Sequence, residues 1–320
     1  MADNEARERP SIFWGENSTR KWNTFTLQFE FCCQSHRLGL IVPKRCKIEN
    51  IDKGVLVDQA LFWPGVVLAG VLGSVAGRLL NVAIGAMFTK SHFRALQLFC
   101  STCNRKLKRK GLVPIVGYLQ IFGRCPFCGT LMPLRILLLE ILSTVAFIYV
   151  AISYKATLLP QGVVLLLYIE LLLVIAIIDL EQRLVLDKLL YAVAPVSLLL
   201  APWGPPGVEL SVKNAYISAL QGGALSFLFF ATIFFIAKNR FGAGDVKLSL
   251  VLGLIMGLPL AVIGFQIGIA MGGFVALVLV TLRQKKLNGE LPFAPFLAGG
   301  TIVVLLWGQN LLSWYEGLVN

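Results

Sequence analysis

Long apolar segments constrain the fold of this chain more than any other feature. Its 320 residues contain eight of them, and the longer ones reach the roughly 20 residues that an α-helix needs to cross a bilayer. Because the apolar residues are continuous rather than alternating, they predict helices and exclude a membrane β-barrel. Only 14% of the residues are charged, against about a quarter in soluble proteins. We therefore predict an all-α, polytopic membrane protein with about eight transmembrane helices, near residues 62–88, 134–153, 162–179, 188–203, 213–237, 246–258, 259–282 and 293–315.

The positions of Lys and Arg predict which helix ends face the cytoplasm. Residues 90–135 include nine Lys or Arg and no Asp or Glu, and cytoplasmic loops are enriched in basic residues. Counting helices outward from this loop puts the segment after Asp179 and the segment before Asp245 on the same side. The two aspartates are therefore predicted at one cytoplasmic face, although they lie far apart in the chain. The net charge of +12 is explained by these loops and does not require a nucleic-acid partner.

Residues 1–60 do not follow the membrane pattern. They contain nine Lys or Arg, eight Asp or Glu and no apolar span. They also lack the charged-then-apolar order of a signal peptide. We interpret residues 1–60 as an N-terminal extension, to which the sequence assigns no function.

Four of the seven cysteines form two CxxC pairs in the basic loop. The pairs are separated by 21 residues and consist of Cys100, Cys103, Cys125 and Cys128. Two CxxC pairs at this spacing are typical of a tetrahedral site with four thiolates, most often for structural zinc. A pair of disulfides is the alternative, and a reducing cytoplasm argues against it.

Two carboxylates stand at the ends of apolar segments. Asp179 ends one segment, and Asp245 follows Gly242-Ala-Gly at the start of another. Taken singly, Asp179 could be a helix end that reaches the lipid headgroups, and Asp245 an N-cap. Charged groups at membrane depth are costly, however, and usually functional. The glycines would leave room for a substrate backbone and permit unusual φ angles.

A pair of aspartates suits peptide hydrolysis. Two carboxyl groups within hydrogen-bond reach share one proton, because both cannot easily ionise. The ionised member can then activate a water while the protonated member polarises a peptide carbonyl. Asp179 and Asp245 thus predict the chemistry of an aspartyl protease.

Other polar residues within the predicted helices are weaker candidates. Glu140 and Glu170 lie inside apolar segments, where they could be functional or could be satisfied by neighbouring helices. Arg78 and Asn81 are three residues apart, on one face of the first helix. A polar pair of this kind more often joins helices than forms a site.

Four segments resemble, in the same order, the motifs of the bacterial type IV prepilin peptidases. This family consists of bifunctional leader peptidase/N-methyltransferases, which are GxGD membrane aspartyl proteases. The segments are the tetracysteine loop 100–128, the first aspartate motif 178–187, the GxGD motif 242–248 and the segment 291–296 before the last helix. The resemblance covers most of residues 62–315.

The resemblance implies an enzyme of the bacterial inner membrane that serves type IV pili or type II secretion. It would cut the short basic leader from prepilins or pseudopilins at the cytoplasmic face and then methylate the new N-terminal residue with S-adenosylmethionine. Asp179 and Asp245 would be the catalytic pair. The four loop cysteines would bind zinc in an N-terminal membrane region, residues 61–160, associated with methylation. Residues 161–320 would form the peptidase region.

Two departures from the family pattern leave alternatives open. Leu186 replaces the proline that usually precedes the second aspartate of the first motif, and the segment Gly77–Val82 differs from the usual first-helix motif. A peptidase without methyltransferase activity is therefore one alternative. A transporter that uses the carboxylates as a proton or cation relay is another. A transporter would be expected to show an internal repeat with broken helices, and none is visible.

Overall fold

The computed structural model describes residues 49–88, 103, 114–153, 159–183, 186–204, 211–236, 242–282 and 292–319. These residues are almost entirely α-helical, and no β-strand occurs among them. The chain divides into two compact units, Met1–Gln59 and Ala60–Asn320. The bundle described below belongs to the second unit.

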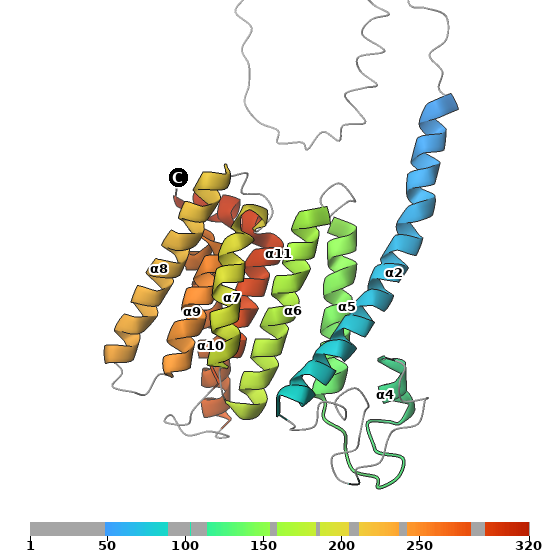
Figure 1. The fold of residues 1–320 in the computed structure, drawn as a ribbon, viewed down its shortest axis with the longest axis horizontal. Helices are drawn as coiled ribbons and strands as arrows, with labels where there is room; N and C mark the ends of the chain where they lie inside the picture. Colours follow the sequence, from blue (N-terminus) through green and yellow to red (C-terminus); the bar gives the residue numbers. More distant parts are fainter. Residues whose placement is uncertain are drawn as a thin grey trace, which may run out of the picture. The chain divides into compact units, whose positions relative to one another are not determined.

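Each of the eight apolar segments is helical, so the predicted helix positions are confirmed (Figure 1). The first helix is longer than expected. It begins at Glu49 rather than near residue 62 and accommodates Pro64 within its length. Two short elements, α4 (Val116–Gln120) and η3 (Ala201–Trp203), lie in the connections. The long helices are α2 (Glu49–Phe88), α5 (Arg135–Ser153), α6 (Leu159–Gln182), α7 (Asp187–Leu199), α8 (Val212–Ile236), α9 (Ala243–Met256), α10 (Leu260–Thr281) and α11 (Ala294–Val319).

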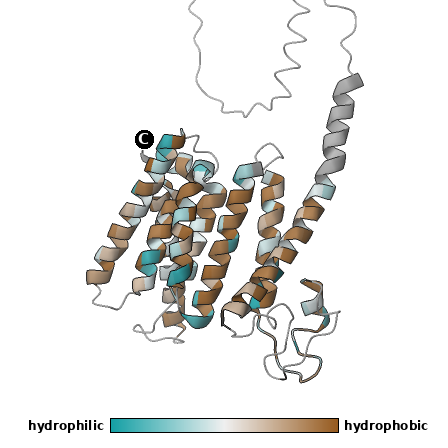
Figure 2. Cartoon of the chain, viewed as in Figure 1, coloured by the Kyte–Doolittle hydropathy of each residue, from teal (hydrophilic) through white to brown (hydrophobic). Residues whose placement is uncertain are grey.

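Six helices of the described residues are long and apolar enough to cross a membrane: α2, α5, α6, α8, α10 and α11. Helices α7 and α9 have 13 and 14 residues, fewer than the roughly 20 needed to span a bilayer. Figure 2 shows hydrophobic residues along the helices and hydrophilic residues at the lower ends of α6 and α7. The chain is thus a multi-pass, all-α membrane protein, while the count of eight spans stays a prediction.

Helix α6 is the most enclosed of the candidate spans. Of its most apolar stretch of 18 residues, 61% is buried, against 22–39% for the other five helices. Leu172, Ile175 and Ile178 are among its fully packed residues. Asp179 therefore comes at the end of a helix that is surrounded by protein rather than by lipid.

Close backbone packing holds α9 against α8. A Cβ atom at Gly222 would lie 2.5 Å from the backbone oxygen of Gly253, so only glycine allows this approach. Helix α9 ends at Met256 and is capped by Gly257, whose φ of +65° favours glycine. The next residue, Leu258, donates its N–H to the backbone oxygen of Ser218 on α8, at 3.2 Å. These contacts fix the helix that carries Asp245.

Candidate active site and metal centre

Asp179 is enclosed at the end of α6, with 5% of its surface exposed. The backbone N–H of Ala294, the first residue of α11, donates to its Oδ2 at 3.2 Å. The N-terminus of a helix carries partial positive charge, which suits a carboxylate partner. Asp179 is therefore not a helix end that reaches the lipid headgroups, which was the alternative to a functional role. The link to α11 was not foreseen, although the prolines in segment 291–296 mark a helix start.

Asp245 is half-buried in the first turn of α9. It is not the N-cap, because that position belongs to Gly242, and no side chain caps the helix. Gly242 has an ordinary φ of −71°, so the freedom of glycine to adopt unusual φ angles is not used at this residue. A Cβ atom there would lie 3.1 Å from Oδ2 of Asp245. The glycine thus makes room for the carboxylate itself.

The structure brings Asp179 and Asp245 to the same end of the bundle. Figure 1 shows the end of α6 and the start of α9 at that end, together with the start of α11. Asp245 belongs to a helix outside the six candidate spans. Burial, and then the negative charge of Asp179, raise the pKa of Asp245 to about 7. The charge of Asp179 therefore acts on Asp245, as two carboxyl groups that share a proton would require.

An ion pair beside the aspartates ties α7 to α9. Lys247 Nζ donates to Asp187 Oδ2 at 2.8 Å and lies 5.6 Å from the centre of the Tyr191 ring. The sequence interpretation missed this pair, although Lys247 follows Asp245 by two residues. Lys247 also borders an apolar cavity of about 300 Å³, lined by Leu190, Tyr191, Ala194, Phe227, Leu250 and Val251.

Three of the four predicted metal ligands come together. The Sγ atoms of Cys103, Cys125 and Cys128 lie within 4.8 Å of one another. Those of Cys103 and Cys125 are 3.8 Å apart, well beyond the roughly 2.05 Å of a disulfide. Cys100 lies outside the described residues. The cluster could hold a metal ion, since converging thiolates are typical zinc or iron ligands.

A tight turn shapes the second CxxC pair. Gly129 N–H donates to the backbone oxygen of Cys125 at 2.9 Å, and Cys125 N–H donates to that of Thr130 at the same distance. Gly129 has a φ of +71°, which favours glycine at this turn. The backbone thereby folds Cys125 and Cys128 toward one point.

Two family models match the chain. One describes the bacterial peptidase A24 N-terminal domain and matches residues 71–154. The other describes the type IV leader peptidase family and matches residues 166–277. The first includes the cysteine loop, and the second includes Asp179 and Asp245. No solved structure matches the chain.

Similar proteins carry one shared name, prepilin leader peptidase/N-methyltransferase. The relative from Bacillus subtilis is 28% identical over 68% of this chain and 84% of its own length. Those from Legionella pneumophila and Aeromonas hydrophila are 27% and 29% identical, over 75% and 73% of their lengths. With family models over most of the bundle and relatives matched over most of their lengths, the chain belongs to the type IV leader peptidase family, the prepilin peptidases.

Proposed function

We propose that the chain is a membrane aspartic endopeptidase that removes the leader from prepilins or pseudopilins and then methylates the new N-terminus. The observation that carries the peptidase is the meeting of enclosed Asp179 and half-buried Asp245 at one end of the bundle, where the charge of Asp179 acts on Asp245. The reaction takes place at the cytoplasmic face of the bacterial inner membrane. The basic loop 90–135 supports this orientation.

The mechanism uses one proton shared by the two carboxyl groups. Asp245 holds this proton and donates it to the carbonyl oxygen of the scissile peptide. Asp179 is the base, because the N–H of Ala294 and the N-terminus of α11 stabilise a negative charge on it. It takes a proton from water as the water oxygen attacks the carbonyl carbon. That proton then passes from Asp179 to the leaving nitrogen, and the C–N bond breaks. The hydroxyl formed on the former carbonyl oxygen returns its proton to Asp245 as the carboxyl product forms, so the pair again holds one proton.

The two membrane regions have different roles in this proposal. Residues 161–320 form the peptidase, and residues 61–160 support methylation with a structural zinc site. The 3.8 Å between Sγ of Cys103 and Cys125 supports zinc, because a tetrahedral site with Zn–S bonds of about 2.3 Å separates its sulfurs by about 3.8 Å. Cys100 would be the fourth ligand, and zinc would fold the loop rather than take part in cleavage.

S-adenosylmethionine would supply the methyl group, in keeping with the methyltransferase name of the relatives. When bound, it would supply an electrophilic methyl group for the amine nitrogen that cleavage frees. We assign no residue to binding the donor. A peptidase without methylation is the second candidate, favoured by the departures at Gly77–Val82 and Leu186.

A cleavage assay in membranes tests the proposal. A model prepilin is incubated with wild type, Asp179→Asn or Asp245→Asn, since asparagine keeps the size and removes the titrating proton. We expect wild type to cleave and each variant to lose about a hundredfold or more of the rate. Mass spectrometry of the product N-terminus then separates methylating from non-methylating enzyme. Cleavage by both variants at the wild-type rate would reject the aspartate pair.

A further inference from the structure

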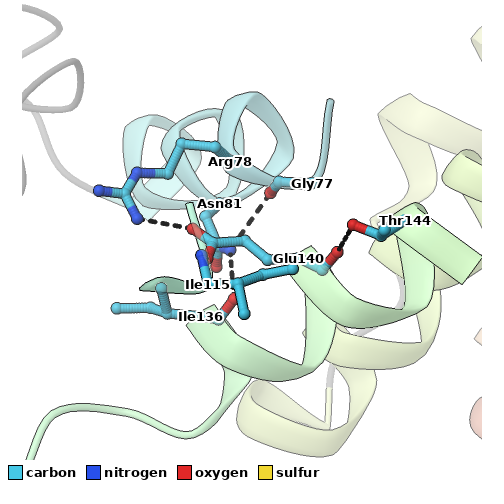
Figure 3. A network of polar contacts seen from close by, with 7 residues as sticks. All are labelled: Gly77, Arg78, Asn81, Ile115, Ile136, Glu140 and Thr144. Carbon is cyan, nitrogen blue, oxygen red and sulfur yellow. Dashed lines mark hydrogen bonds and ion pairs between the residues drawn. The ribbon is translucent and has the colours of Figure 1, made fainter. Parts of the chain in front are cut away.

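Glu140 is a buried carboxylate that the proposed chemistry does not use. It lies on α5, and none of its surface is exposed. Figure 3 shows its side chain between α2 and the segment that precedes α4. Its Oε1 accepts a hydrogen bond from Arg78 of α2 at 2.6 Å, and its Oε2 accepts one from the backbone N–H of Ile115, also at 2.6 Å. One side chain thus joins two membrane helices to the cysteine loop.

The backbone at Ile115 adopts a conformation that its side chain disfavours. Its φ is +59°, and positive φ is rare for a β-branched residue. Such a conformation persists only where surrounding contacts impose it. The hydrogen bond to Glu140 is the contact that receives the Ile115 N–H. It therefore fixes the chain direction at the entry to α4.

Helices α2 and α5, which carry Arg78 and Glu140, are packed closely against each other. A Cβ atom at Gly77 would lie 2.7 Å from the backbone oxygen of Leu139, so α2 and α5 touch through their backbones. Asn81 Nδ2 donates to the backbone oxygens of Gly77 and Ile136, each at 3.2 Å. The interpretation of Arg78 and Asn81 as residues that join helices is consistent with these contacts.

The loop packs on the same part of α5. Tyr118, Met132 and Ile136 form a buried apolar cluster, and the Tyr118 hydroxyl donates to the backbone oxygen of Met132 at 3.2 Å. Cys125 and Cys128 lie between these two loop residues in the chain. A shift of the Ile115 backbone would therefore move Tyr118. It would disturb the contact between Tyr118 and Met132 that supports the turn holding Cys125 and Cys128.

We propose that Glu140 is a positioning residue that seats the cysteine loop on the membrane helices by accepting the Ile115 N–H. The metal cluster then depends on Glu140, whereas the aspartate pair does not. The link to methylation rests on the proposed function. The seating of the loop does not, because it can be measured without either activity.

Two double variants separate the seating role from a purely structural ion pair. In the swapped pair, Arg78→Glu with Glu140→Arg, the ion pair between α2 and α5 is kept. The new guanidinium has only donors, however, and cannot accept the Ile115 N–H. In the neutral pair, Arg78→Met with Glu140→Gln, the ion pair is lost but the amide oxygen can accept. Thr144→Val is the matched control, because the Thr144 hydroxyl donates to the backbone oxygen of Glu140, at 2.6 Å, and not to its carboxylate.

Four readouts are taken on the full chain in membranes: bound zinc, maleimide labelling of the loop cysteines, the rate of prepilin cleavage and the methylated fraction of the cleaved product. We expect the swapped pair to lose zinc, to label about tenfold faster and to lose about tenfold in methylated fraction, with cleavage unchanged. The neutral pair and Thr144→Val should stay within about threefold of wild type.

Other outcomes overturn the inference. Wild-type zinc content and labelling in the swapped pair would show that the ion pair alone matters. Equal losses in both double variants would also reject the acceptor role. Loss of cleavage in the swapped pair would assign the contact to the whole bundle rather than to the loop. If wild type neither cleaves nor methylates, the proposed function fails, while zinc and labelling still test the seating of the loop.

Discussion

At the scale of the residue, the environment of Asp245 sets the pH range of the proposed peptidase. Burial and the charge of Asp179 raise its pKa to about 7, so it keeps its proton well above the usual range of an aspartate. As the pH rises past this value, Asp245 loses the proton that the carbonyl oxygen needs. We expect kcat/KM for cleavage to fall about tenfold per unit above roughly pH 7, and to fall again in acid as the base is protonated.

Glu316→Gln is the matched control for this profile. Glu316 is an exposed carboxylate near the end of α11, whereas Ala294 at the start of α11 contacts Asp179. Its removal should leave the curve unchanged. A wild-type rate that stays constant between roughly pH 6 and 9 would contradict the shared proton.

The residue scale also shows the limits of reading a sequence. The GxGD motif identified Asp245, but not that Gly242 makes room for its carboxylate with an ordinary φ. Nor did the sequence indicate that Ala294 N–H would contact Asp179, 115 residues earlier. Motifs report which residue types are needed, whereas such contacts depend on how distant helix ends meet.

At the scale of the element, the packing of α8 on α9 controls the position of Asp245. A Cβ atom at Gly253 would overlap the backbone oxygen of Gly222, and backbone cannot give way as a flexible side chain can. Gly253→Ala should therefore push the two helices apart, lower the melting temperature in detergent and reduce cleavage at least about tenfold.

Gly273→Ala provides the comparison. Gly273 lies in α10, and a Cβ atom there would meet nothing within 4 Å. This variant should melt and cleave as wild type does. If Gly253→Ala behaved in the same way, the close approach of α8 and α9 would have no influence on the site.

The positions of the helices were predictable from sequence, because membrane helices need continuous apolar segments and turns interrupt them. The beginning of α2 was not, since charged residues interrupt segment 49–61, which therefore lacks the continuous apolar run of a span. The CxxC spacing predicted convergence of thiolates, and three of the four sulfurs do converge. The sequence left open that the cysteine loop is attached to the membrane helices through Glu140, because one glutamate in an apolar helix could be functional or structural.

At the scale of the whole molecule, the two family domains predict two separable activities. The cysteine loop lies within residues 71–154, and both aspartates lie within residues 166–277. Cys125→Ser should reduce bound zinc and methylation, yet leave cleavage within about threefold of wild type, because a structural metal site shapes its own loop. Zinc analysis of purified protein and mass spectrometry of the product measure both effects. Loss of cleavage in this variant would contradict the separation.

Methylation depends on cleavage, although cleavage does not depend on the cysteine loop. Methylation needs the amine that cleavage creates, so Asp245→Asn should yield neither cleaved nor methylated product from an intact prepilin. When the same variant receives a peptide that already begins at the cleavage point, it should methylate that peptide at the wild-type rate, whereas Cys125→Ser should not. Failure of Asp245→Asn on the pre-cut peptide would mean that the aspartate pair also serves methyl transfer. The two regions would then form one site, because a carboxylate outside the methyltransferase region would be needed for its chemistry.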